Sequence, residues 1–81
     1  MEMPMIQRAT QVKARMTQHC LSSQWLILRL FRDHGIDVDK ATVSRIMSGE
    51  RLSGGRAEQV ISASEAILDA YEAYYNGVEG A

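Results

Sequence analysis

Cysteine and proline are nearly missing from this sequence. Cys20 is the one cysteine, so no disulfide can form within the chain. No Cys/His spacing typical of a metal site accompanies it, so no metal or other cofactor is expected, and we interpret the thiol as a small apolar filler in a reducing cytoplasm. Pro4 is the one proline, and long stretches without proline favour helices over strands.

Long apolar runs are missing as well. The longest, WLILRLF at residues 25–31, is interrupted by Arg29 and is far too short to span a bilayer. The N-terminus does not show a charged region followed by an apolar stretch, which is the pattern of a signal peptide. We therefore expect a cytoplasmic protein with no membrane partner.

The charge is nearly balanced overall but unevenly distributed. The chain has 81 residues, 46% of them hydrophobic, which allows one small domain over residues 1–81. All nine Lys and Arg residues lie within residues 1–56, whereas residues 57–81 contain half of the ten acidic residues and no base. This asymmetry predicts one end that meets a polyanion and another kept away from it, with a chance distribution of solvated charges as the alternative.

Four segments have the apolar spacing of amphipathic helices. In residues 4–19, apolar side chains recur three or four positions apart, and Pro4 suits a first helical turn. The second segment begins with Ser22 or Ser23 as its N-cap, because a serine hydroxyl can accept a hydrogen bond from an unpaired backbone N–H. It ends at Gly35, which can adopt the left-handed conformation that terminates many helices.

The third and fourth segments follow the same spacing rule. The third, KATVSRIMS, is capped by Asp37 or Asp39. The fourth begins near Gly55 and keeps its periodicity to about Tyr75, where an Asn-Gly pair ends it. A break at residues 62–64 is the alternative, since serines there could cap a new helix. The pattern predicts an all-α bundle of four to five helices with a long C-terminal helix.

Two helices joined by a short turn, the second of them short and polar on one face, describe a helix-turn-helix. The stretch LSSQWLILRLFRDHGIDVDKATVSRIMSGER resembles the Cro/lambdoid-repressor (XRE-like) helix-turn-helix family. The matching residues are LSS and Leu26 at the start of the second helix, then TVSRI and SGER at the end of the motif. The resemblance covers roughly residues 12–61, with the motif at about 22–49. One departure is the longer passage FRDHGIDVDKA, which predicts either an extra turn of the second helix or an enlarged loop.

The resemblance implies a transcriptional regulator like those of small phages or prophages. Such a protein represses by occupying an operator in double-stranded DNA. A protein-binding module on the same fold, of the antirepressor or antitoxin kind, is the alternative, because the chain has a pI of about 6.1 and an acidic last helix. An enzyme is not expected, since no acid–base pair, nucleophile constellation or phosphate-binding glycine loop is visible.

By analogy with the family, the helix at about residues 39–48 enters the major groove, where its N-terminal residues reach base edges. Base contacts are expected from Lys40, Ala41, Thr42, Ser44 and Arg45. Contacts with backbone phosphates are expected from Ser23, Gln24, Ser48, Arg51, Ser53 and Arg56. The phosphate contacts set register and affinity and carry little sequence information.

The apolar stripe of the acidic last helix ends in tyrosines, which supply a large contact area with a polar tip. Part of the stripe must cover the core, and we expect the remainder to form a homodimer contact. The residues expected there are Leu68, Tyr71, Tyr74 and Tyr75. Symmetric dimers that read two half-sites are common in this family. The same acidic helix is where a protein partner would bind under the alternative.

Overall fold

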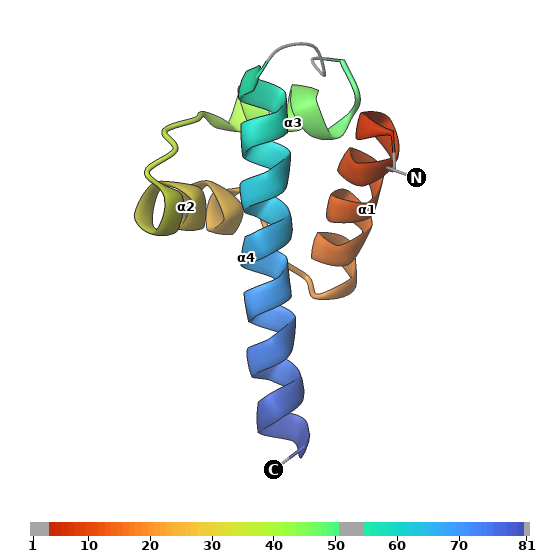
Figure 1. Ribbon diagram of the computed structural model, residues 1–81, viewed down its shortest axis with the longest axis vertical. Coiled ribbons are helices and arrows are strands. Elements are labelled where there is room, and N and C mark those ends of the chain that lie inside the picture. The colour runs from red at the N-terminus through yellow and green to blue at the C-terminus, as the bar shows by residue number, and fades with distance from the viewer. Residues whose placement is uncertain (1–3, 51–54, 81) are drawn as a thin grey trace.

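The computed structural model describes residues 4–50 and 55–80, with side chains as far as Tyr75. Within these residues the chain forms four helices and no strand: α1 (Met5–Gln18), α2 (Ser23–His34), α3 (Lys40–Met47) and α4 (Gly55–Gly80). In Figure 1, α4 runs along the long axis with α1 and α2 on either side of it, and α3 lies beside its N-terminal turns. The expected all-α bundle with a long C-terminal helix is confirmed.

The helix-turn-helix pair begins at a serine cap. Ser22 Oγ accepts a hydrogen bond from the Trp25 N–H at 3.1 Å, so Ser22 is the N-cap of α2. Gly35 ends α2 with φ +65°, a conformation that costs a residue with a Cβ about 1–2 kcal/mol. Residues 35–39 nearly match the usual turn of about four residues, so the extra length noted in the sequence lies in α2 itself.

The connection between α2 and α3 is held from both ends. Ile36 and Val38 are buried in the core, and the Arg56 guanidinium donates a hydrogen bond of 2.6 Å to the Asp37 carbonyl. Asp39, the second of the two candidate caps, accepts a hydrogen bond from the Thr42 N–H at 2.7 Å and starts α3. These contacts fix the direction in which α3 leaves the turn.

The core collects one face from each helix, as the three-four spacing predicted. Its largest fully buried side chains are Val12, Leu26, Leu30, Val43, Ile46, Val60, Ile61, Ser64 and Leu68. Each apolar side chain of this size contributes about 1.5–3 kcal/mol when fully buried. The placement of Leu68 in a dimer contact is therefore wrong, because its side chain lies on the inward stripe of α4 with Ile61 and has no exposed surface.

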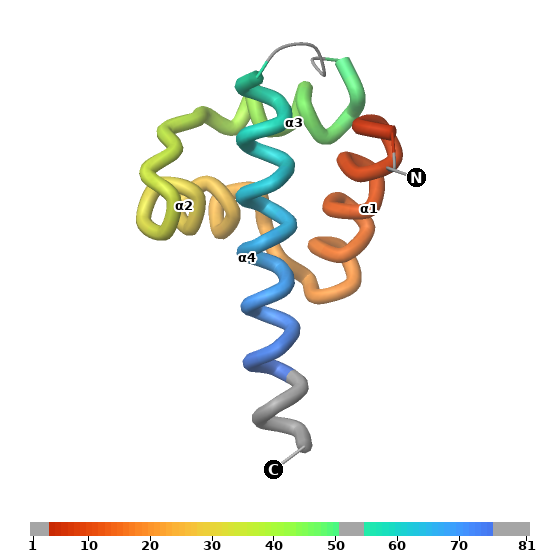
Figure 2. Tube along the Cα trace, in the orientation of Figure 1, coloured from red at the N-terminus to blue at the C-terminus, as the bar shows by residue number. Residues whose placement is uncertain are grey.

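α4 is longer than the sequence pattern predicted, and it is unbroken. The buried Ser64 hydroxyl donates to the Val60 carbonyl at 2.7 Å, so this serine is satisfied inside the helix and caps no new one. The helix continues to Gly80, past the Asn-Gly pair expected to end it, since each of these residues weakens a helix by about 1 kcal/mol or less. Its C-terminal part extends beyond the other three helices (Figure 2). No described helix is long and apolar enough to cross a membrane.

Much of the uneven charge is neutralised between α1 and α4. The pairs are Arg8–Glu65 at 2.6 Å, Arg15–Asp69 at 2.7 Å, Arg15–Glu72 at 2.8 Å and His19–Glu72 at 3.0 Å. Acidic residues of α4 therefore have a structural task, which is to hold α1 along α4. This task accounts for three of the acidic residues of α4.

The short connection between α1 and α2 contains the one cysteine. Cys20 is exposed and has φ +56°, the left-handed region that residues other than glycine rarely occupy. The interpretation of Cys20 as an apolar filler is wrong, because the tight turn after α1 directs its side chain to solvent. Its backbone N–H donates to the Thr17 carbonyl at 3.1 Å, and that of Leu21 donates to the Met16 carbonyl at 2.8 Å.

Candidate nucleic-acid interface

α3 presents a polar face to solvent. Its buried face consists of Val43, Ile46 and Met47. Of the five residues expected at base edges, Lys40, Ala41, Ser44 and Arg45 are exposed, and Thr42 is half-buried. The helix has 8 residues and is therefore about 12 Å long, comparable to the width of the major groove. The structure thus brings the expected base-contacting residues together on one short, anchored helix.

A carboxylate occupies the N-terminus of α3. Hydrogen bonds from Thr42 hold the pKa of Asp39 below its usual range, so this side chain is charged at neutral pH. The charge stabilises the helix N-terminus but disfavours a phosphate at that position. A phosphate beside α3 is better placed elsewhere along the helix.

A groove of about 210 Å³ lies between α1, the start of α2 and the side of α3. Its polar lining consists of Lys13, Thr17, Ser23, Ser44 and Ser48, and its apolar lining of Met16, Leu21, Val43 and Met47. The groove brings two of the expected phosphate contacts, Ser23 and Ser48, next to an expected base contact, Ser44. Sequence reasoning missed Lys13 and Thr17, although their four-residue spacing places both on one side of α1.

The first turn of α2 offers backbone donors at the edge of this groove. Ser22 Oγ satisfies the Trp25 N–H, and the first intrahelical bond runs from the Leu26 N–H to the Ser22 carbonyl at 3.2 Å. The N–H groups of Ser23 and Gln24 precede that bond and have no carbonyl of the helix to bind. Gln24 is exposed and Ser23 is half-buried, so both expected phosphate contacts lie at an accessible helix terminus.

The remaining expected phosphate contacts are distributed differently. Ser48 is exposed, and its hydroxyl donates to the Arg45 carbonyl at 3.0 Å. Arg56 is exposed, yet its bond to the Asp37 carbonyl makes it a support of the connection before α3. Arg51 and Ser53 lie outside the described residues.

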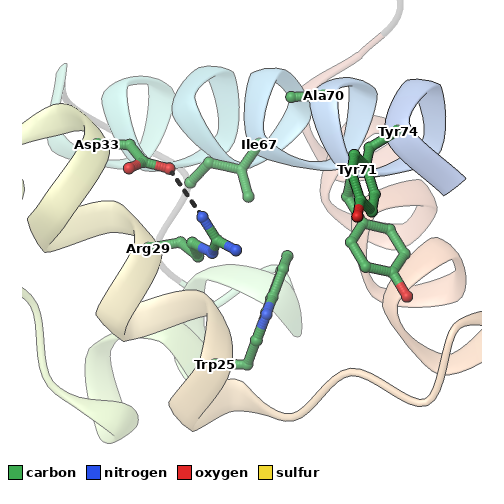
Figure 3. A pocket seen from close by; sticks show the side chains of 7 residues that line it. All are labelled: Trp25, Arg29, Asp33, Ile67, Ala70, Tyr71 and Tyr74. Carbon is green, nitrogen blue, oxygen red and sulfur yellow. Dashed lines mark ion pairs between the residues drawn. The ribbon is translucent and has the colours of Figure 1, made fainter.

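A second groove, of about 310 Å³, lies between α2 and α4 (Figure 3). It is lined by Trp25, Arg29, Asp33, Ile67, Ala70, Tyr71 and Tyr74. Trp25 and Tyr71 meet edge to face with ring centroids 5.6 Å apart, and Arg29 lies over the Trp25 ring at 5.6 Å. Tyr74 is 74% exposed and Tyr75 44%, so the expected tyrosines, unlike Leu68, do reach the surface.

The described residues contain no group of His, Cys, Asp and Glu side chains that could hold a metal ion. The chain matches no protein family, no curated protein and no solved structure.

Proposed function

We propose that this protein is a sequence-specific transcriptional regulator that binds double-stranded DNA with α3 in the major groove. The observation that supports the proposal is the two-sided character of α3. Lys40, Ser44 and Arg45 are exposed, while Val43 and Ile46 on the opposite face are 2% exposed. A helix anchored in this way can present side chains to base edges without losing its own packing.

The electrostatics are compatible with a polyanion at this surface. Glu65, Asp69 and Glu72 each bind a side chain of α1, so these acidic groups are held at the α1–α4 seam. Lys40 and Arg45 project from a different element, and their local charge matters more for DNA binding than the net charge of -1.

Arg45 is the residue to which we assign most of the sequence preference. Its guanidinium can donate two parallel hydrogen bonds to O6 and N7 of a guanine, which discriminates against other bases by about 1–3 kcal/mol. Lys40 can contact a guanine or a phosphate, and the Ala41 or Thr42 methyl group can contact a thymine methyl. Regulation then follows from occupancy of an operator that blocks polymerase, and it needs no catalytic step.

We further propose that the protein binds DNA as a homodimer. A single small module makes few base contacts, whereas two copies read two half-sites one helical turn apart. The surface that supports this proposal is the α2–α4 groove together with Tyr74 and Tyr75, whose side chains are exposed in the C-terminal part of α4. A second copy would cover exposed aromatic area there.

Selection of bound sequences from randomised duplexes, followed by substitution of Arg45, tests the main proposal. Arg45→Ala should reduce the preference for the selected site over random DNA by about 5- to 150-fold, the equivalent of 1–3 kcal/mol. Arg32→Ala, which removes an exposed cation from α2, is the control and should leave that preference unchanged. A folded protein that enriches no sequence, or an Arg45→Ala variant with full preference, contradicts the proposal and favours the protein-binding alternative.

A further inference from the structure

The three basic residues of α1 have different surroundings. Arg8 and Arg15 are bound by carboxylates of α4, at 2.6 Å from Glu65 and 2.8 Å from Glu72. Lys13 lies between them in the sequence but is exposed on another side of the helix, in the groove against α3. In the part of the chain that the structure describes, its ammonium group has no ion pair or hydrogen bond. The positive charge of Lys13 therefore makes no contact that stabilises the described fold.

The rest of the groove lining is suited to an anion. No carboxylate lines the groove. The side-chain hydroxyls of Ser23 and Ser44 donate to no group among the described residues, and both face the groove from different helices. Met16 and Val43 contribute an apolar wall that keeps part of the site away from water. A cation, two available hydroxyl donors and no acid form a setting in which a phosphate oxygen can be hydrogen-bonded and neutralised.

The groove lies beside α3, the helix that we propose to bind in the major groove. Ser44 and Ser48 line it from one side of α3, and the exposed Arg45 lies about 100° around the same helix from Ser44. A helix that enters the major groove is flanked by the phosphates of the strands that border it. The side of α3 that faces α1 thus meets a backbone phosphate when its outer face meets bases.

We propose that the groove between α1 and α3 binds one backbone phosphate of the duplex, with Lys13 as its counter-charge and the hydroxyls of Ser23 and Ser44 as donors. The inference rests on the proposed function and adds α1 to the DNA-binding surface. It also gives the α1–α4 ion pairs a second consequence: Arg8 and Arg15 fix the backbone of α1 on both sides of Lys13, and so fix the point from which the Lys13 side chain projects into the groove. A rigid phosphate contact sets the register of α3 on the bases.

The salt dependence of DNA binding tests the role of Lys13. Lys13→Gln should reduce the slope of log K against log salt by about 0.9, the contribution of one neutralised phosphate, for selected and random duplexes alike. Between 50 and 200 mM salt that change corresponds to about a 3.5-fold smaller loss of affinity. Arg32→Gln removes the same charge from α2, outside the groove, and should keep the wild-type slope.

A scan with uncharged phosphates locates the contact. Single methylphosphonate groups are placed in turn along the selected duplex. At one position next to the bases bound by α3, the substitution should lower the affinity of the wild-type protein but not that of Lys13→Gln. The phosphate site is rejected, and the proposed function stands, if the wild-type protein prefers its selected site but Lys13→Gln has the wild-type salt slope and the same response as wild type to every methylphosphonate position. If the wild-type protein binds no duplex at low salt, the proposed function fails, and the inference fails with it.

Discussion

Arg15 binds Glu72 through both carboxylate oxygens, with Nε 3.1 Å from Oε2 and Nη2 2.8 Å from Oε1. The arrangement is the bidentate pairing that makes arginine–carboxylate contacts directional and strong. His19 Nε2 lies 3.0 Å from Oε2 of the same carboxylate. The hydrogen bonds from Arg15, followed by that from His19, lower the pKa of Glu72, and the bonds to Glu72 and Asp69 raise the pKa of Arg15. The C-terminal end of α1 is thereby fastened to α4.

This contact predicts that the free energy of unfolding depends on pH. Because the pKa of Glu72 is lower in the folded chain than in the unfolded one, the pair stabilises the fold above the ordinary glutamate pKa. That contribution is lost as the pH falls through the lowered value. Glu72→Gln should reduce the free energy of unfolding at pH 7 by about 1 kcal/mol, and the difference from wild type should shrink toward pH 3. Urea unfolding at both pH values measures it, with the exposed Glu50→Gln as the control. A difference that does not change with pH contradicts the assignment.

The turn after α1 predicts a stabilising substitution. Cys20 has φ +56°, a conformation that destabilises the folded chain at a residue with a Cβ. Its side chain is exposed, so no packing contact offsets that cost. Cys20→Gly should raise the free energy of unfolding by about 0.5–1 kcal/mol, the relief of left-handed strain less the added freedom of glycine in the unfolded chain. Cys20→Val, with a β-branched side chain at the same φ, should be destabilised relative to wild type. Denaturant unfolding under reducing conditions checks both, and equal stability of the two variants would contradict the prediction.

The cap of α3 separates stability from DNA binding. Asp39→Ala removes the hydrogen bond from the Thr42 N–H and should lower the free energy of unfolding measurably. Asp39→Asn keeps the cap, since asparagine caps as well as aspartate, and should unfold like wild type. The asparagine variant also lacks the negative charge at the N-terminus of the helix that we propose to bind DNA, so its affinity for duplexes should rise by about two- to fivefold at low salt. Unchanged affinity at every salt concentration would argue against α3 as the DNA-facing helix.

The elements of this fold could be predicted from the sequence because their signals are local. Ser22, Gly35 and Asp39 begin or end helices through bonds to residues within a few positions, so composition and spacing place these helix ends to within two residues, with Ser23 and Asp37 left as alternative caps. The partners of charged side chains are not local. Nothing in α1 alone distinguishes Lys13 from Arg15, because the difference arises from Glu72, which is 57 positions from Arg15 and faces only one side of the helix.

The apolar spacing of α4 also could not predict where along the helix the buried core ends. Leu68 and Tyr71 are three positions apart and both continue the apolar stripe, yet Leu68 is fully buried and Tyr71 is only partly covered. How far the stripe is covered depends on where α1 and α2 cross α4, which periodicity does not report. The α1–α3 groove could not be predicted for the same reason, since its lining comes from three consecutive helices whose packing against one another the apolar spacing does not report.

Tyr74 provides the sharpest test of the proposed homodimer. Because its side chain is 74% exposed, Tyr74→Ser removes aromatic surface with little effect on the fold of one copy. If a second copy covers this tyrosine, the substitution should weaken dimerisation by about 30-fold or more, the usual consequence of losing a central aromatic anchor. Sedimentation at micromolar concentration measures the shift, and Gln59→Ser, at an exposed position near the other end of α4, should sediment like wild type. A wild-type protein that is monomeric at these concentrations contradicts the dimer. The two half-sites of an operator would then be bound independently. The affinity for each half-site would be the same on one duplex as on two separate duplexes, whatever the spacing between them.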